Sequence, residues 1–349
     1  MIAHVHANAI AASTGGNLVG VASRSAASAR RFAQEHGVAF HTDDLSALLA
    51  HPRLNALCIT TPSGTHLQAA LSAAEAGKHL LVEKPIEVTP ARVAELVSAC
   101  NRNGVKLAAV FQARFGAGAA KVKEAVEAGR LGRLALCSAY VKWFRDQAYY
   151  DEGDWKGTYE LDGGGALMNQ SIHAIDLLQW LVGMPTRVSA MTGTLTHERI
   201  EVEDNAVACL RFPSGALGVI EGSTSTFPGF RRKIELSGDM GTVRLEDDAI
   251  TCWEFAQAQD GDERIREEYG LSNEVASGAS DPRQKVNLGH NRQVQDLIDA
   301  ILEDRPPRIE GGEGGKAVAI IDAIYESART GVPVDVPTIY PAPVEGGLA

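Results

Sequence analysis

Lys84 stands in a setting that suggests chemistry. It lies in the run Leu80-Leu81-Val82-Glu83-Lys84-Pro85, where an aliphatic stretch typical of a buried strand ends in an acid, an amine and a proline. At the carboxyl end of a strand in an open parallel sheet, a lysine points into a ligand crevice. There it can donate to a substrate oxygen, or exchange a proton if burial lowers its pKa. The plainer interpretation is an ion pair between Glu83 and Lys84.

A second group of polar residues lies on a stretch that is predicted to form one long helix, residues 163–182. Asn169, His173 and Asp176 fall at positions i, i+4 and i+7 and therefore share one face of that helix. The opposite face carries the apolar stripe Ile172, Ile175, Leu178, Leu181 and Val182. A structural network in which His173 bonds to Asp176 would explain the polar face, and so would a substrate site.

These two motifs together resemble the Gfo/Idh/MocA family of NAD(P)-dependent sugar and cyclitol oxidoreductases. The resemblance is carried by "TTPSGTH" at 60–66, "EKP" at 83–85 and "GGGALMNQSIHAIDLLQWLVG" at 163–183. It implies hydride transfer between NAD(P) and a secondary alcohol or ketone of a sugar, sugar derivative or cyclitol. Lys84 would hold the reacting oxygen and His173 would act as acid/base, or the two would exchange roles, while Asn169 and Asp176 orient His173.

Asn169 departs from one branch of the family. Inositol dehydrogenases place an aspartate at this position, where its charge would raise the imidazole pKa and orient the ring. The neutral amide of Asn169 can orient a ring but adds no charge. Members that act on nucleotide-linked amino sugars are similar to this Asn variant, although this one residue does not assign the substrate.

The end of the second expected strand bears on the choice between NAD and NADP. NAD-preferring enzymes carry an acid there for the ribose 2′-hydroxyl, whereas this chain has Ser23 and Arg24. Serine and arginine can hold a 2′-phosphate by charge-assisted hydrogen bonds, which favours NADP(H). The alternative is that Arg24 stacks on adenine or caps the next helix.

The resemblance implies further contacts. Those with the cofactor are Thr61, Pro62, Ser63, His66, Glu83, Lys84, Pro85, Gln112, Trp155 and Lys156. Those with the substrate are Lys84, Arg114, Tyr149, Asn169, His173 and His290. Ser63 or Thr65 can equally cap the helix expected at 67–76. Lys156 replaces the arginine of a family "W-R-G-T" passage, so the planar guanidinium that makes a bidentate contact is absent there.

Two domains are expected from the length and from the pattern of elements. Residues 1–117 alternate helices and strands, which together with the resemblance predicts an α/β Rossmann-type dinucleotide-binding domain, and "QARF" at 112–115 resembles the family's passage between domains. Residues 118–340 are expected to form an α+β domain with one mostly antiparallel, open-faced sheet. Its strands are predicted near 134–144, 186–194, 204–212, 215–225, 232–238, 241–247 and 249–255, and its last helices at 291–303 and 315–330.

The beginning of the chain lacks a feature that the resemblance implies. A dinucleotide-binding domain starts with a strand and a G-x-G-x-x-G turn before its first helix, but the helix expected here at 3–13 has neither before it. Without that mid-sheet strand its neighbours would have unpaired buried backbone groups. We therefore expect Met1 to be an internal methionine of a longer chain, with the N-terminus truncated. A chain that begins here would bind cofactor poorly or differently, and the alternative function is a non-catalytic sugar- or dinucleotide-sensing protein.

Composition excludes several classes of function. The formal charge of −11 argues against nucleic acid or an anionic membrane as partner, and no apolar run is long enough to span a membrane. The five cysteines are scattered, which predicts reduced thiols in a cytoplasmic protein. No metal site is expected, because His4 and His6 would point about 200° apart on a helix.

The remaining segments are connections. Residues 257–288 form a long polar stretch that is either a lid or interface arm or disordered, residues 306–315 are expected to be a loop, and 341–349 a disordered tail. The resemblance implies that the open sheet face makes a subunit interface, hence a homodimer or homotetramer.

Overall fold

The N-terminal part alternates helices with short parallel strands, as its sequence predicts. The computed structural model describes residues 2–271 and 288–337. The first elements are α1 (Ile2–Ala12), β1 (Gly20–Ala22), α2 (Ala26–His36), β2 (Phe40–Thr42), α3 (Leu45–Leu49), β3 (Ala56–Ile59), η1 (Ser63–Thr65), α4 (His66–Glu75), β4 (His79–Val82), α5 (Pro90–Arg102), β5 (Leu107–Ala109) and η2 (Gln112–Phe115).

Local signals explain several of these boundaries. The side chains of Ser25, Asp44 and Thr89 accept backbone N–H groups at the N-termini of α2, α3 and α5. Gly37 ends α2 with a φ of 66°, a left-handed conformation that favours glycine. These three helices therefore begin where a side chain satisfies a free backbone N–H, and α2 ends where the N–H of Gly37 donates to the carbonyl of Ala33.

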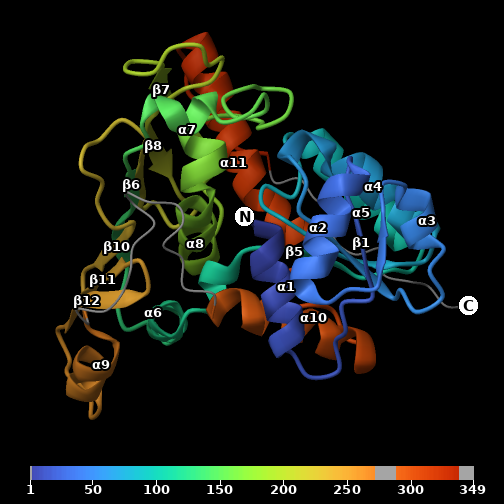
Figure 1. The fold of residues 1–349 in the computed structure, drawn as a ribbon. Helices are drawn as coiled ribbons and strands as arrows, with labels where there is room; N and C mark the ends of the chain where they lie inside the picture. The colour runs from blue at the N-terminus through green and yellow to red at the C-terminus, as the bar shows by residue number, and fades with distance from the viewer. Residues whose placement is uncertain (1, 272–287, 338–349) are drawn as a thin grey trace, which may run out of the picture.

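The strands of this part form two separate parallel sheets. β1 pairs with β2, and β3, β4 and β5 form the other sheet in that order. No strand among the described residues hydrogen-bonds β1 to β3. One face of the second sheet is covered by α1 and α10 (Leu288–Leu302), whose Ala9, Val294 and Leu297 pack on Leu81 and Val110. Figure 1 shows these two helices side by side.

The second part is built on an eight-stranded sheet. Its elements are α6 (Ala117–Glu127), β6 (Leu134–Lys142), α7 (Gln147–Asp151), η3 (Ala166–Ser171), α8 (Ile172–Val182), β7 (Arg187–Gly193), β8 (Asn205–Arg211), β9 (Leu217–Ser223), β10 (Lys233–Gly238), β11 (Gly241–Glu246), β12 (Ala249–Phe255), α9 (Asp262–Tyr269), α11 (Gly311–Thr330) and β13 (Val334–Asp335). The strand order is β12-β11-β10-β6-β9-β8-β7-β13, and only the β6–β9 pair is parallel. This confirms the predicted mostly antiparallel sheet.

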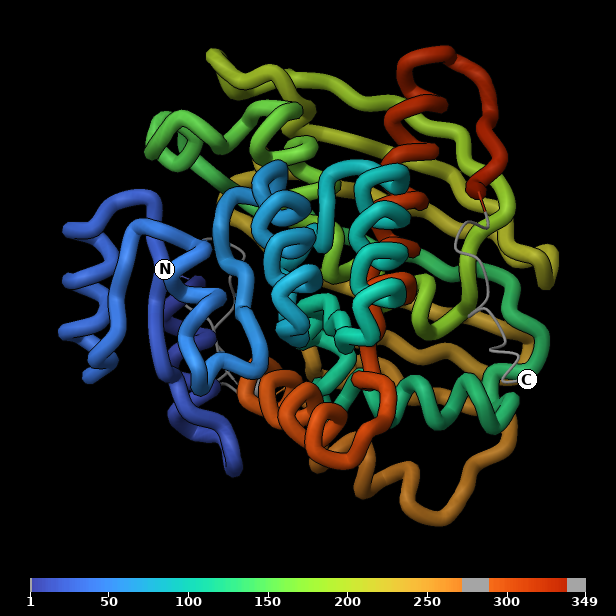
Figure 2. Tube along the Cα trace, turned by 90° about the vertical axis from the view of Figure 1, so that its right-hand side faces the viewer, coloured from blue at the N-terminus to red at the C-terminus, as the bar shows by residue number. Residues whose placement is uncertain are grey.

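The helices α8 and α11 cover one face of this sheet and join it to the N-terminal part. α8 packs on β6 and β10, and α11 packs on β7, α8 and α5. In Figure 2 the red helix α11 passes between the N-terminal helices and the strands. The segment before α11 pairs with the edge of β5, where the N–H of Ala109 donates to the carbonyl of Ile309 at 3.0 Å. The C-terminal part thus returns to the N-terminal sheet.

The structure corrects two predictions about helices. The stretch predicted as one long helix begins as a π-helix, Ala166–Ser171, before the α-helix α8. The glycine run expected in a loop forms the buried first turns of α11. A Cβ on Gly314 would overlap that of Ala109 on β5, so the glycines permit close packing that a loop prediction does not anticipate.

Other predicted segments are only partly described. The polar stretch from residue 257 contains α9, which Figure 1 shows at the far end of the molecule. Residues 272–287 and the expected tail 341–349 lie outside the described residues. None of the described helices has the length and apolar character needed to span a membrane.

Candidate active site

Glu83 and Lys84 leave the end of β4 in different directions. The carboxylate of Glu83 contacts Nε2 of His6 at 2.7 Å and accepts the backbone N–H of Lys84 at 2.9 Å. The ammonium group of Lys84 donates to the backbone carbonyl of Asn169 at 2.7 Å. The ion pair of Glu83 is therefore with His6, and the Lys84 side chain reaches across to the segment that carries His173.

The pair of His6 and Glu83 is buried and strongly coupled. Burial alone would raise the pKa of Glu83, but the hydrogen bond and charge of His6, with the charges of His290 and Lys84, lower it to about 2. Burial likewise opposes protonation of His6, yet Cys58 and Glu83 raise the pKa of His6 well above its usual value. This charged pair fixes α1 against the end of β4, where Lys84 begins.

The triple-glycine turn before η3 is held by Glu203, a residue that the sequence did not single out. Its carboxylate accepts the N–H groups of Gly165 at 3.0 Å and Leu167 at 2.8 Å, and the hydroxyl of Tyr325 at 2.9 Å. Burial raises the pKa of Glu203 to about 7. A Cβ on Gly165 would overlap the Glu203 carbonyl, so the tight turn requires glycine.

His173 is buried at the start of α8, next to the passage between the two parts of the chain. Its Nε2 lies 3.4 Å from the side-chain nitrogen of Gln112, and its ring stands edge-on to Phe111 at 5.8 Å between centroids. The carboxamide oxygen of Gln112 is buried and accepts no hydrogen bond from the described residues. Gln112, expected at the cofactor, therefore lies directly beside the expected acid/base.

Asp176 does not take the role that the sequence suggested. Its carboxylate accepts two hydrogen bonds from Arg114, at 2.5 and 2.7 Å, and one from Gln179 at 3.4 Å. His173 and Asp176 both lie on the regular helix α8, but the contact with Arg114 of η2 determines where the Asp176 carboxylate points. The expected pairing of Asp176 with His173 is replaced by a buried ion pair with Arg114.

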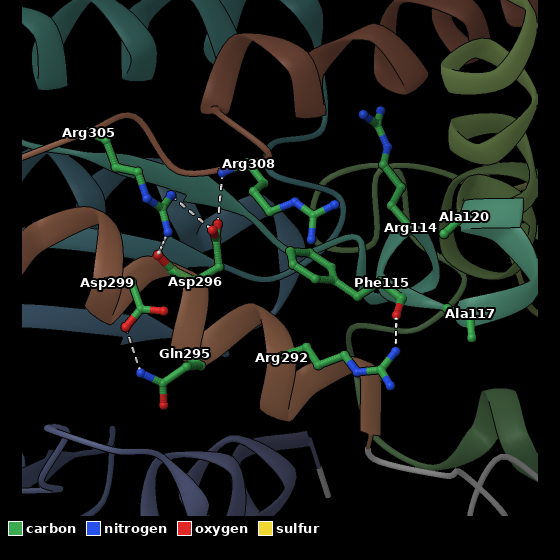
Figure 3. Close-up of a pocket in the computed structure, with 11 residues that line it drawn as sticks. Arg114, Phe115, Ala117, Ala120, Arg292, Gln295, Asp296, Asp299, Arg305 and Arg308 are labelled. Carbon is green, nitrogen blue, oxygen red and sulfur yellow. Dashed lines mark hydrogen bonds and ion pairs between the residues drawn. The ribbon is translucent and has the colours of Figure 1, made fainter. Parts of the chain in front are cut away.

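Arg114 was expected at the substrate, but its guanidinium is engaged elsewhere. Burial lowers the pKa of this group, and Asp176 and Glu313 more than compensate, so that it is raised. Arg114 lines a pocket of about 560 Å³ with Arg292, Arg308 and Asp296, which Figure 3 shows between η2, α10 and the segment before α11. Neither Lys84 nor His173 lines that pocket.

Asn169 contacts Asp162 rather than His173. Its side-chain nitrogen donates to the carboxylate of Asp162, and its oxygen accepts from Gln170 at 2.7 Å. The Asp162 carboxylate also accepts the N–H of Gly157 at 3.0 Å. Asp162, like Glu203, is a residue that sequence reasoning missed. Its local signal in the sequence was an acid directly before three glycines.

The aromatic loop lies next to this group. The hydroxyl of Tyr149 accepts from Gln170 at 2.9 Å, and burial raises the pKa of Tyr149. The ammonium group of Lys156 lies 4.1 Å from the Tyr149 ring centroid and donates to the Tyr149 carbonyl at 2.9 Å. Trp155, half-buried, accepts from Thr158 through its carbonyl at 2.8 Å. Tyr149 thus touches the Asn169 network through Gln170.

The "TTPSGTH" turn connects the two expected motifs. His66 lies between the carbonyls of Thr61, at 2.9 Å, and Pro85, at 3.0 Å, and burial lowers its pKa. The N–H of Gly64 donates to the carbonyl of Leu161 at 2.9 Å. Ser63 is buried, and neither it nor Thr65 forms a side-chain cap on the following helix. The turn therefore contacts both the end of β4 and the segment before the glycines.

The remaining predicted residues lie farther apart. Ser23 and Arg24 follow β1, where Arg24 is exposed and the cap of α2 is supplied by Ser25. The ring of His290 is buried and meets that of His6 edge-on, with 5.5 Å between centroids. His6, Glu83 and His290 place potential ligand atoms within 4.8 Å of one another, whereas His4 belongs to a different group with Glu35 and His36.

Comparison with known proteins matches both parts of the chain. Residues 1–111 match the description "Oxidoreductase family, NAD-binding Rossmann fold", and residues 119–244 match "GFO/IDH/MocA C-terminal domain". A levoglucosan dehydrogenase from Pseudarthrobacter phenanthrenivorans is 27% identical over 348 residues, covering 90% of this chain and 87% of that protein.

Two solved structures extend the comparison over almost the whole chain. The WlbA dehydrogenase from Bordetella pertussis, in complex with NADH and UDP-GlcNAcA, is 36% identical, covers 97% of this chain and 95% of its own, and has a TM-score of 0.87. The WlbA dehydrogenase from Chromobacterium violaceum, with the same two ligands, is 32% identical, covers 97% and 94%, and also has a TM-score of 0.87.

Proposed function

This chain belongs to the GFO/IDH/MocA family of NAD(P)-dependent oxidoreductases, and on that premise we propose that it oxidises a secondary hydroxyl of a nucleotide-linked sugar acid. The substrate class proposed is that of UDP-GlcNAcA, with NAD⁺ or NADP⁺ as hydride acceptor. Its relatives include dehydrogenases named for levoglucosan and inositol. The observation that carries the proposal is the convergence of Lys84 on the segment that presents His173.

Two observations support the choice of substrate class. The solved structures that are 36% and 32% identical hold NADH together with UDP-GlcNAcA. The position four residues before His173 is Asn169, the variant that resembles members acting on nucleotide-linked amino sugars. Both observations favour a nucleotide-linked amino sugar derivative over a free cyclitol.

The residues present fit a nicotinamide beside His173. The buried carboxamide oxygen of Gln112 accepts no hydrogen bond from the described residues. It can therefore accept one from an N–H donor such as a carboxamide. Thr61, Pro62, Ser63 and Pro85 lie at the carboxyl ends of β3 and β4, where cofactors bind in open parallel sheets. When bound, the cofactor accepts the hydride at nicotinamide C4.

The chain's own residues would handle the proton and the oxygen. Lys84, whose ammonium already hydrogen-bonds a carbonyl, would donate to the substrate oxygen and stabilise negative charge that develops there. His173 would take the hydroxyl proton, with Gln112 at 3.4 Å limiting the position of its ring. Asn169 would keep the Lys84 ammonium in place through its backbone carbonyl.

We further propose that a second copy of the chain covers the open face of the large sheet. Four exposed apolar side chains lie on this face in two register pairs, Leu136 beside Leu217 and Met191 beside Val207. Exposed apolar side chains gathered on one face are typical of an interaction surface.

We also propose that the protein works in the reducing cytoplasm, because all five cysteines are free thiols.

The test is a comparison of substrates by formation of reduced cofactor. The purified chain is incubated with NAD⁺ or NADP⁺ and with UDP-GlcNAcA, levoglucosan or myo-inositol, and NAD(P)H absorbance is followed. We expect UDP-GlcNAcA to be turned over with the highest kcat/KM. Turnover of levoglucosan or inositol alone would overturn the substrate class while leaving the dehydrogenase activity intact.

A further inference from the structure

We propose that Asp162 is a positioning residue of this active site, which orients the amide of Asn169 and electrostatically stabilises the ammonium group of Lys84. The inference rests on the proposed function, in which Lys84 acts on the reacting oxygen. It concerns a residue that precedes the triple glycine and that the sequence did not mark as functional.

The hydrogen bonds around Asp162 fix the direction of each group. Asp162 is 1% exposed, and its two oxygens accept separately from Gly157, at 3.0 Å, and from the side-chain nitrogen of Asn169. The oxygen of Asn169 accepts from Gln170 at 2.7 Å. The Asn169 amide is therefore held by an acceptor on its nitrogen side and a donor on its oxygen side, which leaves it one orientation.

Asn169 in turn holds Lys84. The Lys84 ammonium donates to the backbone carbonyl of Asn169 at 2.7 Å, so that a shift of Asn169 would move the amine. The π-helical geometry of Ala166–Ser171 places this residue outside a regular α-helical repeat. Its N–H donates to the carbonyl of Gly165 at 2.9 Å, and its side chain is held by Asp162.

The carboxylate of Asp162 interacts electrostatically with two lysine ammonium groups and two tyrosine hydroxyls. The charges of Lys84 and Lys156 favour the ionised form of Asp162, and the charge of Asp162 contributes to raising the pKa of Tyr149 and Tyr150. Burial raises the pKa of Asp162 to about 6, so most molecules carry its charge at neutral pH. A negative charge in this position favours the ammonium form of Lys84.

Exchange of the two side chains provides a sharp test, because the hydrogen bonds have a fixed polarity. In Asp162→Asn the new amide accepts from Gly157 but turns its nitrogen toward the nitrogen of Asn169, which places two donors together. In Asn169→Asp two carboxylates meet. In the double variant Asp162→Asn/Asn169→Asp, the amide at position 162 can accept from Gly157 and donate to the acid at position 169, which still accepts from Gln170.

The experiment measures kcat and kcat/KM against pH for the wild type, both single variants and the exchange variant, with whichever sugar the wild type oxidises. We expect each single variant to lower kcat roughly 10- to 100-fold, as misplacement of a reacting group does. The exchange variant should recover to within about fivefold of the wild type. Cofactor affinity, followed by fluorescence titration with NADH, should change little.

The pH profile separates positioning from mere support of the fold. In Asp162→Asn, loss of the negative charge should move the alkaline limb of kcat/KM to lower pH, and the exchange variant should restore it. The proposal would be overturned if Asp162→Asn kept the kcat of the wild type and its alkaline limb of kcat/KM did not move. It would also be overturned if the exchange variant had a kcat no higher than that of the single variants. If Asp162→Asn fails to fold, the exchange variant, which keeps every hydrogen bond, decides alone. An inactive wild type would instead count against the proposed function.

Discussion

The expected preference for NADP over NAD depends on a single residue, Arg24. It is exposed after β1, and the cap of α2 is made by Ser25. A guanidinium there can bind a 2′-phosphate, whereas a carboxylate would repel it. The structures with 36% and 32% identity hold NADH, so the preference for NADP remains a prediction for this chain.

We predict that Arg24→Asp lowers the ratio of NADPH to NADH affinity by about 10-fold or more, since a charge-assisted contact becomes repulsive. Titration of both cofactors against the wild type and the variant measures the ratio. Arg53→Asp, a change of the same type at another exposed arginine of this part, serves as the control. An unchanged ratio would remove Arg24 from the cofactor site.

Single residues differ in how far the sequence could reveal them. Lys84 and His173 were predicted from short motifs, and the Lys84 ammonium donates to the carbonyl of Asn169, four residues before His173. Glu203 lies 36 to 38 residues from the backbone groups that it binds, so no local pattern indicates it. Asp176 illustrates the reverse, because its helical spacing suggested His173 while a distant arginine is its actual partner.

His6 connects two elements, α1 and β4, through its buried pair with Glu83. The pKa of Glu83 is lowered, so its contribution to stability is present above its unfolded pKa and is lost as the pH falls toward about 2. The pKa of His6 is raised, so its contribution is present below about 6.5 and is lost as the pH rises through the raised value. The pair therefore stabilises the fold most between the unfolded pKa of Glu83 and the unfolded pKa of His6.

We predict that His6→Gln lowers the free energy of unfolding by about 3–5 kcal/mol near pH 5.5, since it leaves a buried carboxylate without its ionic partner. The loss should shrink as the pH rises above the raised pKa of His6. Denaturant unfolding at several pH values measures it, and His41→Gln, an exposed histidine, is the control. An equal loss at every pH would contradict a charged pair.

Gly314 allows α11 to approach β5. A Cβ at this position would overlap that of Ala109, so Gly314→Ala should lower the free energy of unfolding by about 1–3 kcal/mol through overpacking. Thermal unfolding compares it with Asp322→Ala, an exposed change on the same helix. A variant as stable as the wild type would show that the two elements can separate at no cost.

Secondary elements were more predictable than their irregularities. Most predicted helices and strands lie within a few residues of the observed ones, because periodicity and caps are local properties. The π-helical turn and the helical glycines of α11 were not predicted, because both depend on packing against residues distant in sequence. The irregular turn is also the one that carries Asn169.

At the scale of the whole molecule, the large sheet presents one face to α8 and α11 and leaves the other open. Met191 and Val207 are 81% and 53% exposed and lie side by side on neighbouring strands of that open face. Such a surface is expected to be covered by a second copy of the chain.

We predict that Met191→Glu combined with Val207→Glu converts the oligomer to a smaller species, because the carboxylates would be buried without partners. Light scattering after size-exclusion chromatography gives the mass. Leu302→Glu, at an exposed apolar residue at the end of α10, is the matched control. A mass that is unchanged in the double variant, or a monomeric wild type, would contradict the proposed interface.

The two parts of the chain meet where Lys84 of the first part contacts Asn169 of the second, four residues before His173, and this contact is the basis of the proposed activity. The most direct test is the rate of NAD(P)H formation by the wild type, Lys84→Ala, His173→Ala and the double variant. We predict that each single change lowers kcat about 100-fold or more and that the double change lowers it little further, since both residues serve one reaction step. Near-normal turnover by either single variant would contradict the account.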